Sequence, residues 1–85
     1  MQRYCLIMCR SLTNAQRSAQ VLERAGITAT VRKAPQSVSG EGCSYCVKID
    51  ESRLKRALEV LERAALRNGK VYLLEADGAL KEVAR

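Results

Sequence analysis

The apolar positions near the start of the chain follow two different spacings, which predict a strand followed by a helix. Tyr4 to Cys9 is an uninterrupted apolar run of six residues between polar neighbours, a length that suits a buried strand. From Asn14 to Ala25, alanines and a leucine recur every three or four residues, which gives one apolar helical face. Ser11 or Thr13 can cap the start of this helix, and Gly26 can cap its end.

In the middle of the chain, apolar and polar positions alternate. Residues 27–33 are rich in β-branched side chains and predict a half-exposed strand. Residues 34–42 hold the only proline and two glycines, so they predict a loop. Residues 43–49 alternate again, with Cys43, Tyr45, Val47 and Ile49 expected to face one way.

A second amphipathic helix and a last strand complete the pattern. Asp50 or Ser52 can cap this helix, Asn68-Gly69 ends it, and residues 71–74 form a strand before a turn at 76–78. Its apolar stripe has helical spacing and consists of Leu54, Ala57, Leu58, Leu61 and Ala65.

The order strand–helix–strand–strand–helix–strand is that of the ferredoxin-like split motif. Right-handed crossovers leave one compact arrangement, an α+β fold with a four-stranded antiparallel sheet and two helices on one face. Residues 1–85 are expected to form a single domain. The tail, residues 76–85, is either a short extra strand or disordered.

Charge and composition narrow the function classes. The formal net charge is +6, which favours anionic partners but also fits a solvated surface with surplus arginines. The chain has no histidine, which removes the commonest general base, and we expect a protein without a cofactor rather than a conventional enzyme. No apolar stretch approaches the ~20 residues of a membrane span, so we expect a cytoplasmic protein with reduced thiols and no membrane contact.

The four cysteines, in a C-x3-C pair and a C-x2-C pair, raise the question of a metal site. On a strand, Cys5 and Cys9 would lie about 13 Å apart, too far to share an ion, so no metal site is predicted. A thioredoxin-type dithiol normally opens a helix, whereas Cys43 and Cys46 lead into a strand.

Cys43 differs from the other cysteines because it lies where a glycine-containing loop meets a strand. In the predicted topology the start of this strand lies near Cys9 and Arg10, at the end of the first strand, and near Lys33, at the end of the second. Arg10, Lys33 and the amides at the start of the first helix would favour a thiolate, which is the reactive form of cysteine.

The layout over residues 3–74 resembles the small bacterial family of selenium/sulfur carrier protein-like domains. The matching residues are Ala34-Pro35, Gly42-Cys43-Ser44-Tyr45 and the helix start Ser11-Leu12-Thr13. The resemblance implies that Cys43 accepts sulfur or selenium from a donor protein, as a persulfide or selenosulfide, and passes it on. Cys46 or Cys9 could then resolve the loaded thiol as a disulfide.

Two other classes compete with this hypothesis. A basic RNA-binding module would need aromatic side chains on the central strands, where Tyr4 and Tyr45 are the candidates, but the usual glycine–aromatic signature is absent and nucleic acid is the less favoured partner. A regulatory or assembly module would form a homo-oligomer through the open sheet face, using Leu6, Met8 and the exposed side of the second and third strands.

Overall fold

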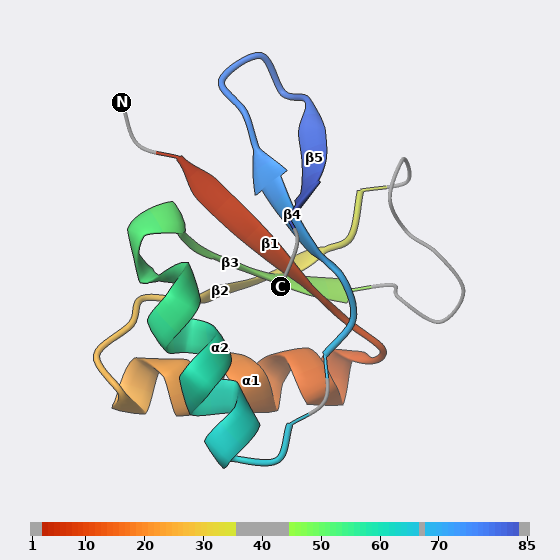
Figure 1. Ribbon diagram of the computed structural model, residues 1–85. Helices are drawn as coiled ribbons and strands as arrows, with labels where there is room; N and C mark the ends of the chain where they lie inside the picture. Colours follow the sequence, from red (N-terminus) through yellow and green to blue (C-terminus); the bar gives the residue numbers. More distant parts are fainter. Residues whose placement is uncertain (1–2, 36–44, 67, 84–85) are drawn as a thin grey trace.

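A computed structural model describes residues 3–35, 45–66 and 68–83 of the chain. It shows an α+β domain in which two helices and a 3-10 turn accompany a five-stranded antiparallel sheet (Figure 1). The elements, in chain order, are β1 (Tyr4–Cys9), α1 (Leu12–Arg24), β2 (Thr30–Lys33), β3 (Tyr45–Asp50), the 3-10 turn η1 (Glu51–Arg53), α2 (Leu54–Arg63), β4 (Val71–Leu74) and β5 (Leu80–Val83).

The strands lie in the order β2-β3-β1-β4-β5, with β1 at the centre. The predicted antiparallel pairing of the first and third strands is confirmed, with Tyr4 opposite Asp50 and Cys9 opposite Tyr45. The sheet has one strand more than the four predicted, because residues 80–83 of the tail form β5 and pair with β4, which confirms the alternative of a short extra strand. An exposed turn makes this possible: Gly78 adopts a φ of 88°, and Asp77 Oδ1 accepts a hydrogen bond of 2.9 Å from the Ala79 amide.

The first helix begins and ends at recognisable caps. Ser11 is the N-cap and its Oγ accepts a hydrogen bond of 3.1 Å from the Asn14 amide, so the helix starts two residues earlier than predicted. At the other end, Gly26 takes a φ of 83° and the Ile27 amide donates to Leu22 O at 2.9 Å. This closure keeps residues 27–29 out of the sheet, so the predicted strand over 27–33 is wrong at its start.

The second helix opens through the 3-10 turn η1. Asp50 Oδ1 accepts hydrogen bonds from the Ser52 amide at 2.9 Å and from the Ser52 hydroxyl at 2.8 Å. The helix ends at Arg63, and Ala65, which was predicted to belong to its stripe, lies beyond the helix with a φ of 57°. The Leu66 amide donates to Leu61 O at 3.0 Å, which closes the helix end before the stripe is complete.

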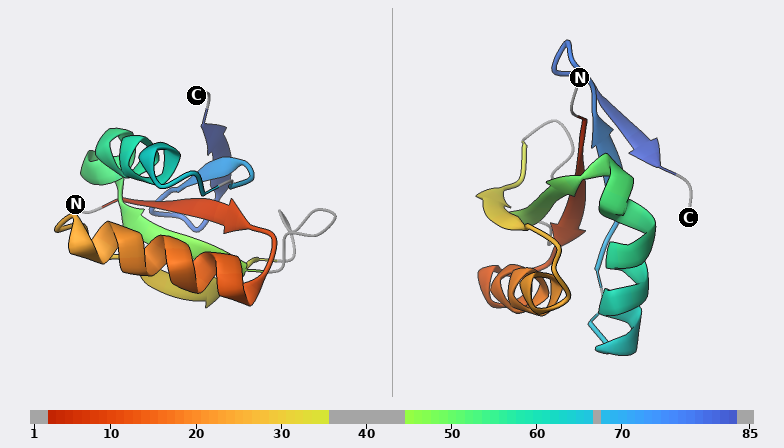
Figure 2. Two further views of the ribbon diagram at one scale, coloured as in Figure 1. Left: turned by 90° about the horizontal axis from the view of Figure 1, so that it is seen from below. Right: turned by 90° about the vertical axis from the view of Figure 1, so that its left-hand side faces the viewer.

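Both helices cover one face of the sheet and meet each other there (Figures 1 and 2). Strand alternation directs every second residue to this face, so Tyr45, Val47 and Ile49 point the same way, as predicted. The buried core under the helices comprises Cys5, Ile7, Cys9, Ala15, Ala19, Leu22, Ile27, Ala29, Val47, Ile49, Ala57, Leu61 and Val71.

The opposite face of the sheet is also partly covered. Leu6 is 4% exposed and Met8 1% exposed, and together with Cys46 they form a second buried cluster, against which Ala34, Tyr72 and Leu80 pack. The predicted apolar docking surface of Leu6 and Met8 is therefore wrong, because side chains of β4 and β5 lie over it. Tyr45 packs against the helix-side core, so it is no stacking platform on the opposite face.

Ser18 provides a test of the packing under α1. Its side chain is fully buried and its Oγ has no hydrogen-bond partner among the described residues. Removing an unsatisfied hydroxyl relieves a desolvation cost, and alanine is the better helix former. We expect Ser18→Ala to raise the free energy of unfolding by about 1 kcal/mol, measured by urea denaturation.

Ser52→Ala is the matched control, since the Ser52 hydroxyl donates to Asp50 Oδ1. We expect this substitution to lower stability by about 0.5–1 kcal/mol. A loss of stability in Ser18→Ala would mean that the Ser18 hydroxyl has a partner after all.

Candidate functional site

Three chain segments meet at one end of the sheet, as the sequence predicted. Cys9, at the end of β1, lies opposite Tyr45 at the start of β3, and Tyr45 in turn lies opposite Lys33 at the end of β2. The candidate carrier residue Cys43 lies outside the described residues. It precedes Tyr45 by two positions in the sequence.

Positive charge gathers at this same end. Arg10 follows β1 directly and is exposed, and Lys33 is exposed at the end of β2. The start of α1 is close by in the chain, because its N-cap is Ser11. The free amides at a helix start carry a partial positive charge. Two cationic side chains, Arg10 and Lys33, and the start of α1 therefore make this end of the sheet electropositive, and we call it the cationic rim.

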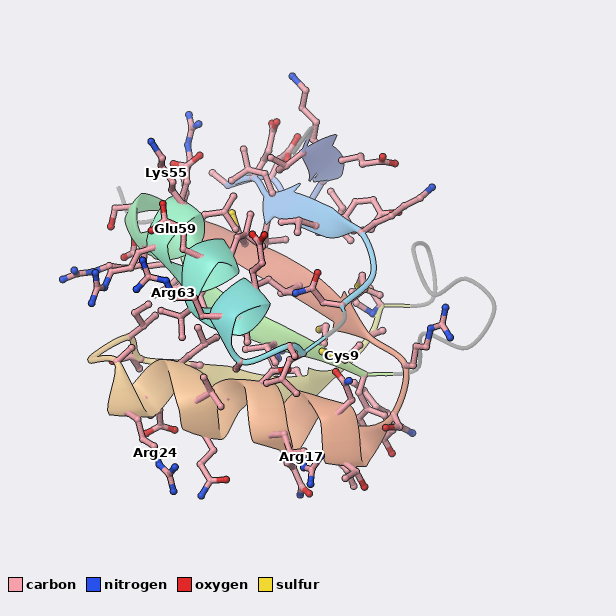
Figure 3. All side chains as sticks on the ribbon, turned by 60° about the horizontal axis from the view of Figure 1, so that its bottom comes forward. Cys9, Arg17, Arg24, Lys55, Glu59 and Arg63 are labelled. Carbon is pink, nitrogen blue, oxygen red and sulfur yellow. The ribbon has the colours of Figure 1, made fainter. Side chains whose placement is uncertain are left out.

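Two of the described cysteines, Cys5 and Cys9, are sealed under the helices. Both are fully buried in the helix-side core, and Figure 3 shows Cys9 between the sheet and α1. Burial raises the pKa of the Cys5 thiol to about 11, with smaller contributions from the negative charges of Glu51 and Asp50. The Cys9 Sγ donates to Ile7 O at 3.5 Å. Neither thiol is presented to solvent.

Cys46 faces the opposite side of the sheet from Cys9. Its Sγ donates weakly to Lys33 O at 3.9 Å, and burial raises its pKa despite the opposing effect of the Arg32 guanidinium. It lines a small cavity of about 170 Å³, together with Leu6, Arg32, Lys33, Pro35 and Leu74. The two candidate resolving thiols therefore lie on opposite sides of the sheet, and Cys46 adjoins a cavity.

A second hollow lies toward the other end of the strands. It is lined by side chains from the starts of β1 and α2, the end of β3 and the chain around β2. The sequence singled out none of these residues as a group, because they come from four separate segments.

Over residues 3–35, 45–66 and 68–83, no group of three or more His, Cys, Asp or Glu side chains is arranged to hold a metal ion. Neither described helix has the length and apolarity needed to cross a bilayer.

The fold and this rim define a small α+β protein that combines buried thiols with a cationic sheet end. A family model described as "Putative Se/S carrier protein-like" matches residues 4–73. The chain belongs to this family, and the resemblance predicted from the sequence is confirmed. The searches of curated proteins and of solved structures found no match.

The raised pKa of Cys5 links stability to alkaline pH. In the unfolded chain the thiol ionises near its ordinary pKa of 9.0, and in the folded protein only near 11. The contribution of the neutral Cys5 thiol to the free energy of unfolding is fully present below pH 9 and is lost as the pH rises toward 11. We expect Cys5 to account for a loss on the order of 2 kcal/mol across this range, measured by urea denaturation.

Cys5→Ala serves as the control, because it removes the titrating thiol and leaves the rest of the chain unchanged. The variant should be less stable at neutral pH, since it leaves a small cavity, but its stability should fall less steeply between pH 9 and 11. If the free energy of unfolding fell equally with pH in the unaltered chain and in Cys5→Ala, the assignment of the loss to Cys5 would be contradicted.

Burial also predicts how the described thiols react. We expect Cys5, Cys9 and Cys46 to resist iodoacetamide in the folded protein at pH 8, because they are buried and the thiolate is the nucleophile. All three should become labelled once urea unfolds the chain. Peptide mass spectrometry gives the extent at each residue, and rapid native labelling of any of the three would contradict the burial described above.

Proposed function

We propose that this chain carries sulfur or selenium on the thiol of Cys43. The observation that carries the proposal is the burial of Cys5, Cys9 and Cys46, which leaves Cys43 as the candidate for transfer in a chain of the selenium/sulfur carrier-like family. The cysteine sulfur that receives the transferred atom must be accessible to a donor protein and to an acceptor protein. A thiol sealed in a core cannot meet that requirement without local unfolding.

The chemistry of loading is a sulfur transfer without net oxidation. The Cys43 thiolate attacks the outer sulfur of a donor protein's persulfide, and a new S–S bond forms at Cys43. The donor's S–S bond breaks, and the donor cysteine leaves as a thiolate. A donor selenosulfide would transfer selenium in the same way. The protein is then a carrier between two partners, and the reaction needs no cofactor.

The cationic rim supports a reactive thiolate. Arg10 follows the residue that pairs with Tyr45, and Lys33 pairs with Tyr45 itself, which supports a role for both cations beside the thiol of Cys43. Positive charge within a few ångströms favours the ionised thiol, and the start of α1 adds to it. Arg10 and Lys33 are accordingly the thiolate-stabilising residues of the proposal.

A second thiol could unload the carrier. Attack of this thiol on the inner sulfur of the Cys43 persulfide forms a disulfide and releases hydrosulfide. Cys46 suits this role better than Cys9, because it adjoins a cavity that Lys33 and Arg32 also line, whereas Cys9 lies beneath the helices. Either cysteine must become exposed by local opening before it can react.

Transfer can be tested directly. The chain is incubated with a cysteine desulfurase and cysteine, and intact and peptide mass spectrometry then locates any added sulfur. We expect one sulfur atom on Cys43 and none on Cys5, Cys9 or Cys46. Arg10→Gln and Lys33→Gln should each slow loading about three- to tenfold at neutral pH, because an increase in the thiol pKa of 0.5 to 1 unit lowers the thiolate fraction by that factor.

The matched variants are Cys43→Ser and Cys5→Ser, which make the same atomic change at the proposed site and in the helix-side core. Cys43→Ser should abolish loading, whereas folded Cys5→Ser should load normally. Undiminished loading of Cys43→Ser, or no loading of the unaltered chain, would end the carrier proposal.

A further inference from the structure

One cleft in the described residues has a volume of about 570 Å³, within the usual size range of small-ligand pockets. We name it the β2–β3 cleft after the strands that form much of it. Its walls come from residues far apart in the sequence, namely Tyr4, Gly26, Thr28, Thr30, Arg32, Lys48, Ile49, Asp50 and Arg53. The family is described by the carrying of selenium or sulfur, which does not call for a ligand pocket of this size.

The strand residues with polar side chains in this cleft share the sheet face opposite the helices. Thr30 lies opposite Lys48 and Arg32 lies opposite Cys46, and paired residues point to the same side of a sheet. Tyr4 lies on that side too, since it pairs with Asp50. The cleft therefore collects two hydroxyl side chains, three cations and one aromatic ring.

The lining of the cleft contains three cations and one carboxylate. Among the described residues, Arg32, Lys48 and Arg53 form no ion pair, and the recorded pair joins Lys70 to Glu82 at 3.6 Å. The one carboxylate of the lining, Asp50, is engaged by the Ser52 amide and hydroxyl. The cleft thus retains an excess of positive charge.

Lys48 is held in place rather than extended into solvent. Its Nζ lies 4.1 Å from the centroid of the Tyr4 ring, a cation–π contact, and its side chain is half-buried. Arg32 and Arg53 approach from β2 and from η1. Charged donors that converge from three elements match a group with at least three acceptor oxygens better than a carboxylate, which has two.

We propose that the β2–β3 cleft binds a small molecule that bears a phosphate group. Arg32, Lys48 and Arg53 supply charge-assisted hydrogen bonds to the phosphate oxygens, and Thr28 and Thr30 add hydroxyl donors. The volume exceeds what one phosphate fills, so the ligand also has an organic part, as a nucleoside monophosphate does. Tyr4 provides the apolar surface for that part.

The far end of the cleft and the cationic rim lie at opposite ends of β3, and Arg32 lines both the cleft and the cavity beside Cys46. Asp50 and Tyr45 are at opposite ends of β3, which places the far end of the cleft roughly 17 Å from the start of that strand. Ligand binding and sulfur loading can therefore be measured independently, and the failure of one does not decide the other.

The test is a titration of the folded chain with pyrophosphate, with adenosine monophosphate and with succinate, followed by calorimetry and by amide chemical shifts. We expect saturable binding of both phosphate compounds and shifts at Thr30, Lys48 and Arg53. Lys48→Gln and Arg53→Gln should each weaken binding about tenfold, since each removes a charge-assisted hydrogen bond.

Arg17→Gln is the matched control, because it makes the same change of charge on the outer side of α1, away from the cleft (Figure 3). It should alter the affinity less than twofold, and thermal unfolding verifies that each variant is folded. The proposal is overturned if neither phosphate compound binds saturably, if all three variants weaken binding equally, or if succinate binds as tightly as adenosine monophosphate.

Discussion

The rest of the structure depends on the burial of β1 on both of its faces. Five consecutive residues, 5–9, are buried, although alternation sends them to opposite sides of the sheet. One side is covered by α1 and α2, and the other by side chains of β4, β5 and the end of β2. Because β1 must be covered twice, it occupies the centre of the sheet and fixes β3 and β4 as its neighbours.

The elements with strong local signals could be predicted from the sequence. The apolar stripes and the caps at Ser11 and Asp50 located both helices, and the order of elements gave the pairing of β1 with β3. β5 was left open because Leu80 and Val83 flank two charged residues, a short pattern that also fits a disordered tail. The sequence also could not show that Leu6 and Met8 are covered, since their cover comes from β4 and β5.

The candidate site was predictable where it depends on strand order and unpredictable where it depends on packing. The meeting of Arg10, Lys33 and the start of β3 follows from the antiparallel pairing. The spacing of Cys5 and Cys9 resembles a ligand motif, yet it reflects two positions on the same side of a strand that point into the core. The β2–β3 cleft was missed because its residues are brought together by the loop before β2 and by the turn η1.

The two outermost strands limit how another protein can attach to this sheet. β2 and β5 are four residues each, and each carries two adjacent charged residues, Arg32 and Lys33 in one and Lys81 and Glu82 in the other. Short, charged edges disfavour the addition of a strand from a second chain. Recognition through side chains rather than the backbone permits rapid release, which the proposed transfer between a donor and an acceptor would require.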